Sequence, residues 1–432
     1  MDIDPLYKIL LVFCAMLLLI RLKIPMGWAM VAGGVALAQW AGRGWALTWA
    51  DLQVALADPA LWLLIVIMAL IFEYGRYLSE ERNAQLILRA ASAWGGRHSR
   101  AVSLMALPAV IGLIPMPGGA LFSAPLVAQL TRDPGLSASW KSAVNYWFRH
   151  VWEYWWPVYP VVIVTLSIFP MPLSLFIAMQ LPLSIAAAVG GYFCLVRPHI
   201  QRLSLVATGE EEPAVNAKGG RVFWPLWLVI GATLLLPPVL GLVMDVPLSV
   251  RRLVAMCLGL GVGLIGILRD SGPHAFRKFA RQLRDPKAFN LIGTVAGVMV
   301  FKTMLERSSL LPAAGEQLID SGVPLILVVA LLPFIAGLVT GIAIGFAGIA
   351  FPLLIGLATS GATELAPVST LMLGFAFGYA GMMCSPIHLC LVLTRGYFGS
   401  SLGALYRYLL PCVLFPLVTA VILYGALTRF GW

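Results

Sequence analysis

Charged side chains are scarce in this sequence. Asp, Glu, Lys and Arg make up 11% of its 432 residues, whereas hydrophobic residues make up 60%, and the mean hydropathy is +0.91. A soluble domain of this length needs far more polar surface, so the scarcity of charge excludes one. The apolar runs also lack the period-two alternation of a membrane β-barrel. Because backbone groups in lipid must bond to one another, we predict an all-α polytopic membrane protein.

The sequence also has little that suggests an enzyme. No HExxH pair occurs, which argues against a zinc-dependent membrane protease. A GVGLIG stretch at 261–266 matches the dinucleotide fingerprint, but it lies within an apolar run with no strand before it. The cysteines are far apart without metal-site spacing, and we expect inert buried thiols. They are Cys14, Cys194, Cys257, Cys384, Cys390 and Cys412. We therefore predict no catalytic residue, no metal and no cofactor.

Two segments, one in each half of the chain, repeat a pattern of Pro and Gly within an apolar run. Residues 107–126 read LPAVIGLIPMPGGALFSAPL, and residues 332–353 read LPFIAGLVTGIAIGFAGIAFPL. Their alignment pairs Pro108 with Pro333, Gly112 with Gly337, and Pro125 with Pro352. Each half-segment has about ten residues, too few for the roughly 20 that cross a bilayer. We predict two re-entrant helical hairpins, at 101–131 and 323–360.

The remaining apolar runs predict ten membrane crossings. They lie at about 6–22, 25–41, 60–76, 142–168, 172–196, 222–242, 246–267, 290–307, 365–394 and 404–428. One hairpin follows the third crossing and the other follows the eighth, so each half has five crossings and one hairpin. Because five is odd, the two repeats are inverted. The predicted domains are a first repeat at 1–196, a cytoplasmic linker at 197–221 and a second repeat at 222–432.

Basic residues indicate how the chain is oriented. Most of the 29 Lys and Arg residues fall in loops on one side of the predicted topology. The positive-inside rule places that side in the cytoplasm, with both termini outside the cytoplasm. The first hairpin then opens from the cytoplasm and the second from the opposite face of the cytoplasmic (inner) membrane. Basic loops facing anionic lipid account for the net charge of +10 without a nucleic-acid partner.

Two crossings are too long for a straight span, and each follows a hairpin. The crossing at 142–168 contains Pro157 and Pro160, and the crossing at 365–394 contains Pro386. Pro removes a helical hydrogen bond, so both helices should break near mid-membrane. Unwound backbone at that depth lines a cavity or is buried in protein, and free helix ends attract ions and substrates. We expect both hairpin tips and both breaks to form one site.

This arrangement resembles the ion transporter superfamily, whose members pair two inverted repeats with re-entrant hairpins and broken helices. The stretches PMPGGALFSAPLV at 115–127 and FRHVWEYWWPVYP at 148–160 resemble, more narrowly, an uncharacterised ten-span family, domain of unknown function 401. The resemblance covers nearly the whole chain. It implies a homodimer in which a transport domain slides against a scaffold as an elevator. That domain would contain both hairpins and the fourth, fifth, ninth and tenth crossings.

Ionisable residues are concentrated in the fourth predicted crossing. Arg149, His150 and Glu153 lie about 8 to 12 residues into it, roughly 12–18 Å deep. Arg149 could bind a carboxylate while Glu153 or His150 binds the driving proton. Alternatively, Arg149 and Glu153 are an internal ion pair, since they are spaced i,i+4 along a helix. His388, after Pro386, is a proton carrier or merely bonds a carbonyl group.

The other candidate substrate ligands are small, hydroxyl or aromatic residues at the tips and breaks. They are Gly118, Gly119, Ser123, Trp156, Tyr159, Thr340, Gly341 and Ser385. The glycines allow close backbone approach, and the aromatic side chains could line a cavity or belong to an interfacial belt. Dicarboxylate carriers of the superfamily hold substrate and sodium with Ser-Asn-Thr motifs at both tips. This chain has no Asn at either tip, which speaks against dicarboxylates and sodium.

Together these patterns favour a secondary transporter of a small organic anion. Protons are the expected coupling ion, and sodium is the less favoured one. The alternative is a cation/proton antiporter that uses Glu153 and His388 without needing Arg149 for its substrate. A membrane scaffold that transports nothing is a third interpretation. The sequence predicts neither the identity of the anion nor the direction of transport.

Overall fold

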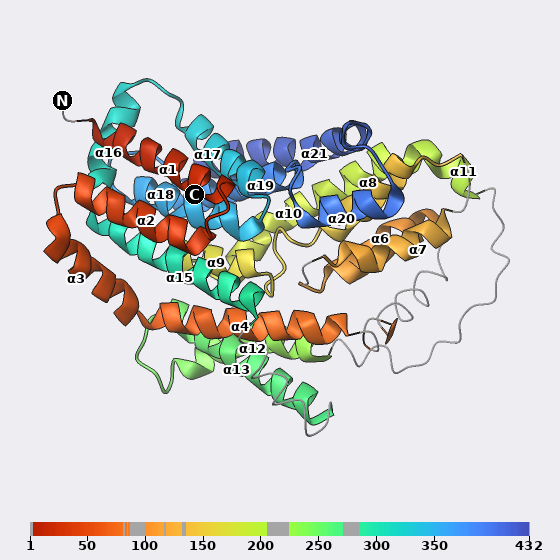
Figure 1. The fold of residues 1–432 in the computed structure, drawn as a ribbon, viewed down its shortest axis with the longest axis horizontal. Helices are drawn as coiled ribbons and strands as arrows, with labels where there is room; N and C mark the ends of the chain where they lie inside the picture. Colours follow the sequence, from red (N-terminus) through yellow and green to blue (C-terminus); the bar gives the residue numbers. More distant parts are fainter. Residues whose placement is uncertain are drawn as a thin grey trace.

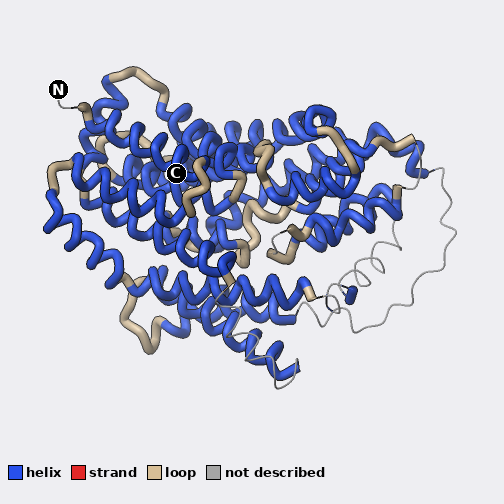
Figure 2. Tube along the Cα trace, in the orientation of Figure 1, coloured by secondary structure: helices blue, strands red, loops and turns tan. Residues whose placement is uncertain are grey.

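The computed structural model describes residues 3–80, 83, 85–86, 100–115, 118–131, 135–204, 224–270 and 285–431. Within these ranges the chain forms helices joined by short loops, without a strand (Figure 2). The predicted all-α fold class is confirmed. The predicted linker at 197–221 lies only partly within the described residues, and its first residues continue as short helical turns, Arg197–His199 and Ile200–Ser204.

The helices follow the predicted apolar runs closely. In the first half they are α1 (Pro5–Arg21), α2 (Met26–Trp40), α3 (Gly44–Ala57), α4 (Pro59–Ser79), α6 (Arg100–Gly112), α7 (Ala120–Leu130), α8 (Ala138–Arg149), α9 (Pro160–Ile168), α10 (Leu173–Gly191) and α11 (Ile200–Ser204). In the second half they are α12 (Trp224–Leu240), α13 (Leu248–Asp270), α15 (Pro286–Arg307), α16 (Leu310–Asp320), α17 (Leu325–Thr340), α18 (Ala343–Thr359), α19 (Pro367–Met383), α20 (Leu389–Phe398) and α21 (Leu402–Arg429).

Three helices, α4, α12 and α13, pack together along the lower side of the molecule in Figure 1. α15 connects this layer to the rest because it packs on both α4 and α2. On the other side, α17 packs against α18 and α19, and α10 packs against α21. The helices α6, α7, α8 and α20 form a separate group of neighbours at one end (Figure 1). Segments from both halves of the chain therefore meet in each part of the bundle.

Both predicted hairpin segments are pairs of antiparallel neighbours. α6 and α7 occupy the first segment, and α17 and α18 occupy the second. The repeated prolines lie inside these helices, for example Pro108 in α6 and Pro333 in α17. A proline inside a helix leaves a carbonyl without its usual partner, so neighbouring segments must supply the missing contact.

Five helices in the described part of the chain are long and apolar enough to cross a membrane. A sixth span results if α16 and α17, which meet at 119°, count as one. The first two helices have 17 and 15 residues and fall short of this length. The chain is thus a multi-pass membrane protein by length and composition, and the count of ten crossings stays a prediction.

Three of the described helices, α3, α11 and α16, lie where no helix was predicted. α3 places the fully buried carboxylate of Asp51 between two arginines. Arg43 Nε lies 2.6 Å from Asp51 Oδ2, and Arg307 Nε lies 2.6 Å from Asp51 Oδ1. Arg43 precedes α3 and Arg307 ends α15, so the carboxylate of Asp51 connects α3 to α15.

Candidate substrate and proton site at the two helix breaks

The fourth predicted crossing is broken more widely than its prolines suggest. α8 ends at Arg149, well before Pro157, and α9 begins with Pro160 in its first turn. Glu153 therefore lies in the break, outside the helix. The expectation that Arg149 and Glu153 share one helix face is wrong, although their side chains do meet. In the second half the break is shorter: α19 ends at Met383 and α20 begins at Leu389, on either side of Pro386 as predicted.

Reciprocal tyrosines explain why the first helix stops at Arg149. The last carbonyl groups of a helix have no partner within it. Tyr379 of α19 donates its hydroxyl to the carbonyl of His150 at 2.7 Å. In return, Tyr146 of α8 donates to the carbonyl of Met383 at 3.1 Å. Each broken helix thus supplies the bond that completes the end of the other.

Side chains in the first break donate hydrogen bonds to carbonyl groups at the end of α6 and directly after it. Trp152 donates to Ala109 at 2.9 Å, and Trp156 donates to Leu113 at 3.0 Å. The hydroxyl of Tyr159 donates to the carbonyl of Gly112. Trp156 and Tyr159, predicted as substrate ligands, thus direct their polar atoms at the hairpin. Their role in substrate binding stays a prediction.

Side chains of the second break likewise form hydrogen bonds to carbonyl groups at the end of α17, in the second hairpin segment. Ser385 donates its hydroxyl to the carbonyl of Leu338 at 2.8 Å. His388 Nδ1 lies 2.8 Å from the carbonyl oxygen of Gly341, which caps the end of α17 with φ +64°. Because a carbonyl oxygen only accepts hydrogen bonds, His388 carries its proton on Nδ1. The expected contact between His388 and a carbonyl group is therefore present, and the Nε2 atom of the ring faces His150 instead.

The ionisable side chains meet in the buried space between the two breaks. Arg149 Nη1 lies 3.7 Å from Glu153 Oε1, and His150 Nε2 lies 3.8 Å from the same oxygen. His388 Nε2 lies 3.3 Å from His150 Nε2. All four residues are buried. The structure thus brings together four of the residues that the sequence singled out, from two segments more than 200 positions apart.

The remaining predicted ligands lie at the hairpin tips and mostly contact their own helices. Ser123 donates to Ala120 within α7, and Thr340 donates to Ala336 within α17. Gly118 has φ +73°, so this turn favours glycine. Gly119 precedes α7 as its N-cap.

Two polar residues near the first tip and the breaks were missed. Asn145 of α8 donates its amide to the carbonyl of Ala120 at 3.0 Å and to the hydroxyl of Thr394 at 3.1 Å. It therefore links the first hairpin to α20 of the second half. Cys390, in the first turn of α20, lies within 4.8 Å of the ring nitrogens of His150 and His388. The expectation that all cysteines are buried is wrong, because Cys14 is exposed.

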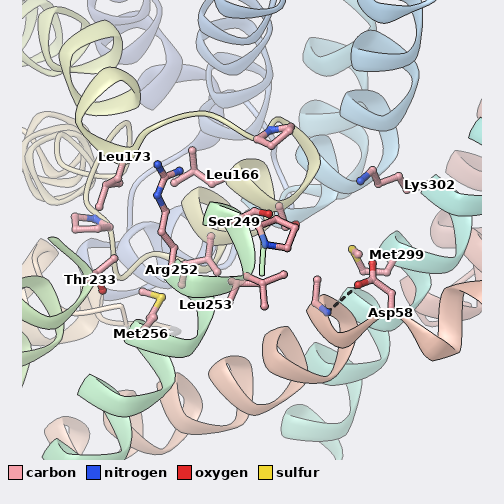
Figure 3. Close-up of a pocket in the computed structure, with 17 residues that line it drawn as sticks. Asp58, Leu166, Leu173, Thr233, Ser249, Arg252, Leu253, Met256, Met299 and Lys302 are labelled. Atoms are coloured by element: carbon pink, nitrogen blue, oxygen red, sulfur yellow. Dashed lines mark hydrogen bonds between the residues drawn. The ribbon is translucent and has the colours of Figure 1, made fainter. Parts of the chain in front are cut away.

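A cavity of about 300 Å³ adjoins the first break and is lined by residues of α4, α9, α12, α13 and α15. Two cationic side chains line it, Arg252 from α13 and Lys302 from α15, on opposite sides in Figure 3. Asp58, at the start of α4, adds one carboxylate, which accepts a bond from the amide of Ala60. Pro157 of the break also lines the cavity. The cavity thus adjoins the first break at Pro157 and carries more positive than negative side chains.

Comparison with known proteins places the chain in a family. Among solved structures, it is similar to the crystal structure of the Alcanivorax borkumensis YdaH transporter, whose topology is described as unusual. The two are 15% identical, the match covers 89% of this chain and 88% of that one, and the TM-score is 0.48. A search of curated proteins returns no match. The family described as "Protein of unknown function (DUF401)" matches residues 6–427. The chain therefore belongs to the DUF401 family.

Proposed function

We propose that this protein is a secondary transporter of a small organic anion in the cytoplasmic membrane, coupled to protons. The observation that carries the proposal is the buried guanidinium of Arg149 at the end of α8, between two broken helices. An arginine stays charged at any physiological pH, and burying it is costly unless it has an anionic partner. The guanidinium of Arg149 lies 3.7 Å from Glu153 Oε1. Its planar fork of donors matches a carboxylate, and we expect a substrate carboxylate to bind it in a bidentate contact.

The cavity beside the break supports an anionic cargo. Arg252 and Lys302 would attract an anion toward the break at Pro157. A volume of about 300 Å³ is at the lower end of ligand pockets, which span roughly 300–1,000 Å³. In the predicted orientation, Asp58, Pro247 and Lys302 all lie at the outer ends of their helices. We infer that this cavity is the approach from outside the cell.

The two facing histidines suggest how protons enter the cycle. His150 Nδ1 lies 2.6 Å from the carbonyl of Tyr146, so both histidines direct Nδ1 at a carbonyl and Nε2 at one another. A proton between the two Nε2 atoms would relieve the repulsion of their lone pairs, and Glu153 lies close enough to stabilise it. Binding and release of this proton would couple to the charge of the cargo at Arg149.

The elevator movement, the homodimer and the outside position of both termini belong to the same proposal. They rest on the resemblance to the ion transporter superfamily and on the distribution of basic residues. In this scheme both hairpins move with α8, α9, α10, α19, α20 and α21, and the aromatic and serine bonds between breaks and hairpins keep these elements together.

One observation favours the alternative, a cation/proton antiporter. The C-terminal ends of α8 and α19 converge at the breaks, and helix C-termini carry partial negative charge that attracts cations. In that scheme Arg149 only neutralises Glu153.

Reconstituted vesicles with a pH-sensitive dye inside distinguish the two schemes. Vesicles are given gradients of lactate, gluconate, succinate and phosphate, each as its sodium and its potassium salt. We expect one of the organic anions to drive proton movement in the wild type. Arg149→Lys should lose anion uptake because an ammonium cannot make the bidentate contact, while protons still exchange. Arg149→Gln should abolish anion transport.

The control is Arg407→Gln, which removes an exposed arginine of α21. It should transport as the wild type does. Sodium- or potassium-driven proton exchange that survives in full in Arg149→Gln would contradict the anion proposal and favour the antiporter. Vesicles that respond to neither anions nor cations would contradict both schemes.

A further inference from the structure

The side chains of His150, His388 and Cys390 form a cluster whose ligand atoms all lie within 4.8 Å of one another. All three residues are buried, and they come from the two breaks, one in each half of the chain. His150 and His388 are 238 positions apart, and the spacing of the cysteines did not indicate Cys390 as a partner of either histidine.

The hydrogen bonds of the histidines fix which nitrogen of each ring faces the cluster. His150 Nδ1 lies 2.6 Å from the carbonyl of Tyr146, and His388 Nδ1 lies 2.8 Å from that of Gly341. A carbonyl oxygen only accepts hydrogen bonds, so each ring carries a proton on Nδ1, and its Nε2 atom is the one that can offer a lone pair to a metal ion. This is the arrangement of metal-binding histidines, which donate the other ring N–H to a carbonyl or carboxylate. Two bare nitrogens at 3.3 Å repel unless a cation lies between them.

The spacing of the two nitrogens matches a tetrahedral metal ion. Zinc–nitrogen bonds of about 2.0–2.1 Å at a tetrahedral angle place two nitrogen ligands roughly 3.3 Å apart. The observed separation of Nε2 atoms is 3.3 Å. Cys390 provides the third ligand from the first turn of α20.

Glu153 lies near the cluster but outside it. Its Oε1 atom lies 3.8 Å from His150 Nε2 and 3.7 Å from Arg149 Nη1, and it does not belong to the group of ligand atoms that lie within 4.8 Å of one another. Two imidazoles and one thiolate suit a borderline-soft divalent ion. Harder ions such as magnesium or calcium prefer oxygen ligands alone.

We propose that His150, His388 and Cys390 bind a divalent transition metal ion of the zinc class between the two helix breaks. The ion joins α8 of the first half to α20 of the second, so it stabilises the two breaks in their present arrangement. It takes the same two nitrogen lone pairs that a shared proton would take. The proposal goes beyond the proposed transport of an anion and does not depend on it.

Cobalt(II) is the probe, because a tetrahedral site with a thiolate gives it intense visible bands and a sulfur-to-metal charge-transfer band. The purified full chain, stripped with chelator, is titrated with Co²⁺ and then with Zn²⁺. We expect both kinds of band at one equivalent of Co²⁺, and their loss when Zn²⁺ displaces it. Cys390→Ser should remove the charge-transfer band, and His388→Gln should weaken Co²⁺ binding at least tenfold.

Cys14→Ser is the matched control, since Cys14 is the exposed cysteine and the natural place for adventitious binding. It should keep every band. X-ray absorption of the zinc-loaded wild type gives a second readout that needs no variant, and should show one sulfur and two imidazole ligands. Absence of the bands in the wild type, or bands that survive in Cys390→Ser and vanish in Cys14→Ser, would overturn the proposal. Anion binding measured with chelator present tests the transport proposal separately.

Discussion

The contact between Gly112 and Arg149 should decide whether the binding site can form. Gly112 ends α6 and packs directly against the carbonyl group of Arg149. In Gly112→Ala, the added Cβ would lie 2.9 Å from the carbonyl carbon and 3.3 Å from the Cα of Arg149, with the oxygen closer still. Ordinary contact begins near 3.4 Å, so the hairpin and α8 must separate by at least about 0.5 Å.

This separation moves the backbone that carries Arg149 and His150. Misplacing a binding group by about 1 Å can cost roughly 100-fold in rate, so we expect Gly112→Ala to lower transport about 10- to 100-fold. The strain itself should cost about 1–3 kcal/mol, which leaves the bundle folded. Gly337→Ala should lower transport in the same way through the second half of the chain, because its added Cβ would lie 2.8 Å from the amide nitrogen of Met382.

The assay is uptake into reconstituted vesicles, with circular dichroism to measure helix content. The control is Gly231→Ala in α12, where an added Cβ meets nothing within 4 Å. It should transport normally. Normal transport by Gly112→Ala, or an equal defect in Gly231→Ala, would refute the steric reasoning.

Three further predictions concern stability. Asp51→Asn removes the carboxylate that binds Arg43 and Arg307, and should lower the free energy of unfolding by about 3 kcal/mol, measured by denaturation in detergent. An unchanged free energy of unfolding would mean that other contacts bind α3 to the bundle. Burial raises the pKa of Asp51, but hydrogen bonds from the two arginines lower it more, so its pKa lies below the ordinary 3.8. The stabilisation that the ionised carboxylate provides is therefore present above about pH 4 and is lost as the pH falls through the lowered pKa of Asp51. In that pH range the melting temperature of the wild type should fall more steeply than that of Asp51→Asn. Tyr379→Phe removes the hydroxyl donor to the carbonyl of His150, which keeps only the amide of Glu153 at 3.2 Å, and should cost about 1 kcal/mol. An unchanged melting temperature would show that the tyrosine bond does not stabilise the end of α8.

Proline and glycine carried most of the fold prediction. Pro386 lies where a helix ends, and Gly118 and Gly341, both with positive φ, lie where the paired helices turn, although the repeated prolines themselves lie inside helices. The pattern shared by the two apolar segments therefore located two pairs of packed helices, α6 with α7 and α17 with α18, and Pro386 located the second break. That these pairs are re-entrant hairpins stays a prediction. The composition was enough for the all-α membrane class.

The first break shows where local reasoning fails. Pro160 marks the start of α9, whereas the end of α8 depends on partners from distant segments, Tyr379 and Gly112. These contacts cannot be read from residues near position 149. The sequence therefore placed Glu153 on a helix that had already ended.

The candidate site was partly predictable for the same reason. Ionisable residues at mid-membrane depth are conspicuous in any sequence, so Arg149, His150, Glu153 and His388 were found. Cys390 was missed because its partners lie in both halves and its spacing fits no local metal motif. The pair of histidine and cysteine two positions apart, directly after Pro386, is the signal that could have revealed it.

Thermal stabilisation by anions tests the central claim most directly. Wild type and Arg149→Gln are melted in chelator-containing buffer with mono- and dicarboxylates, sugar acids, phosphonates and inorganic ions. At a concentration 100 times its Kd, a ligand should stabilise the wild type by about 2.7 kcal/mol. We predict that one organic anion does so and leaves Arg149→Gln unchanged. If no anion stabilises the wild type, or if one stabilises both proteins equally, Arg149 is not the anchor of an anionic substrate.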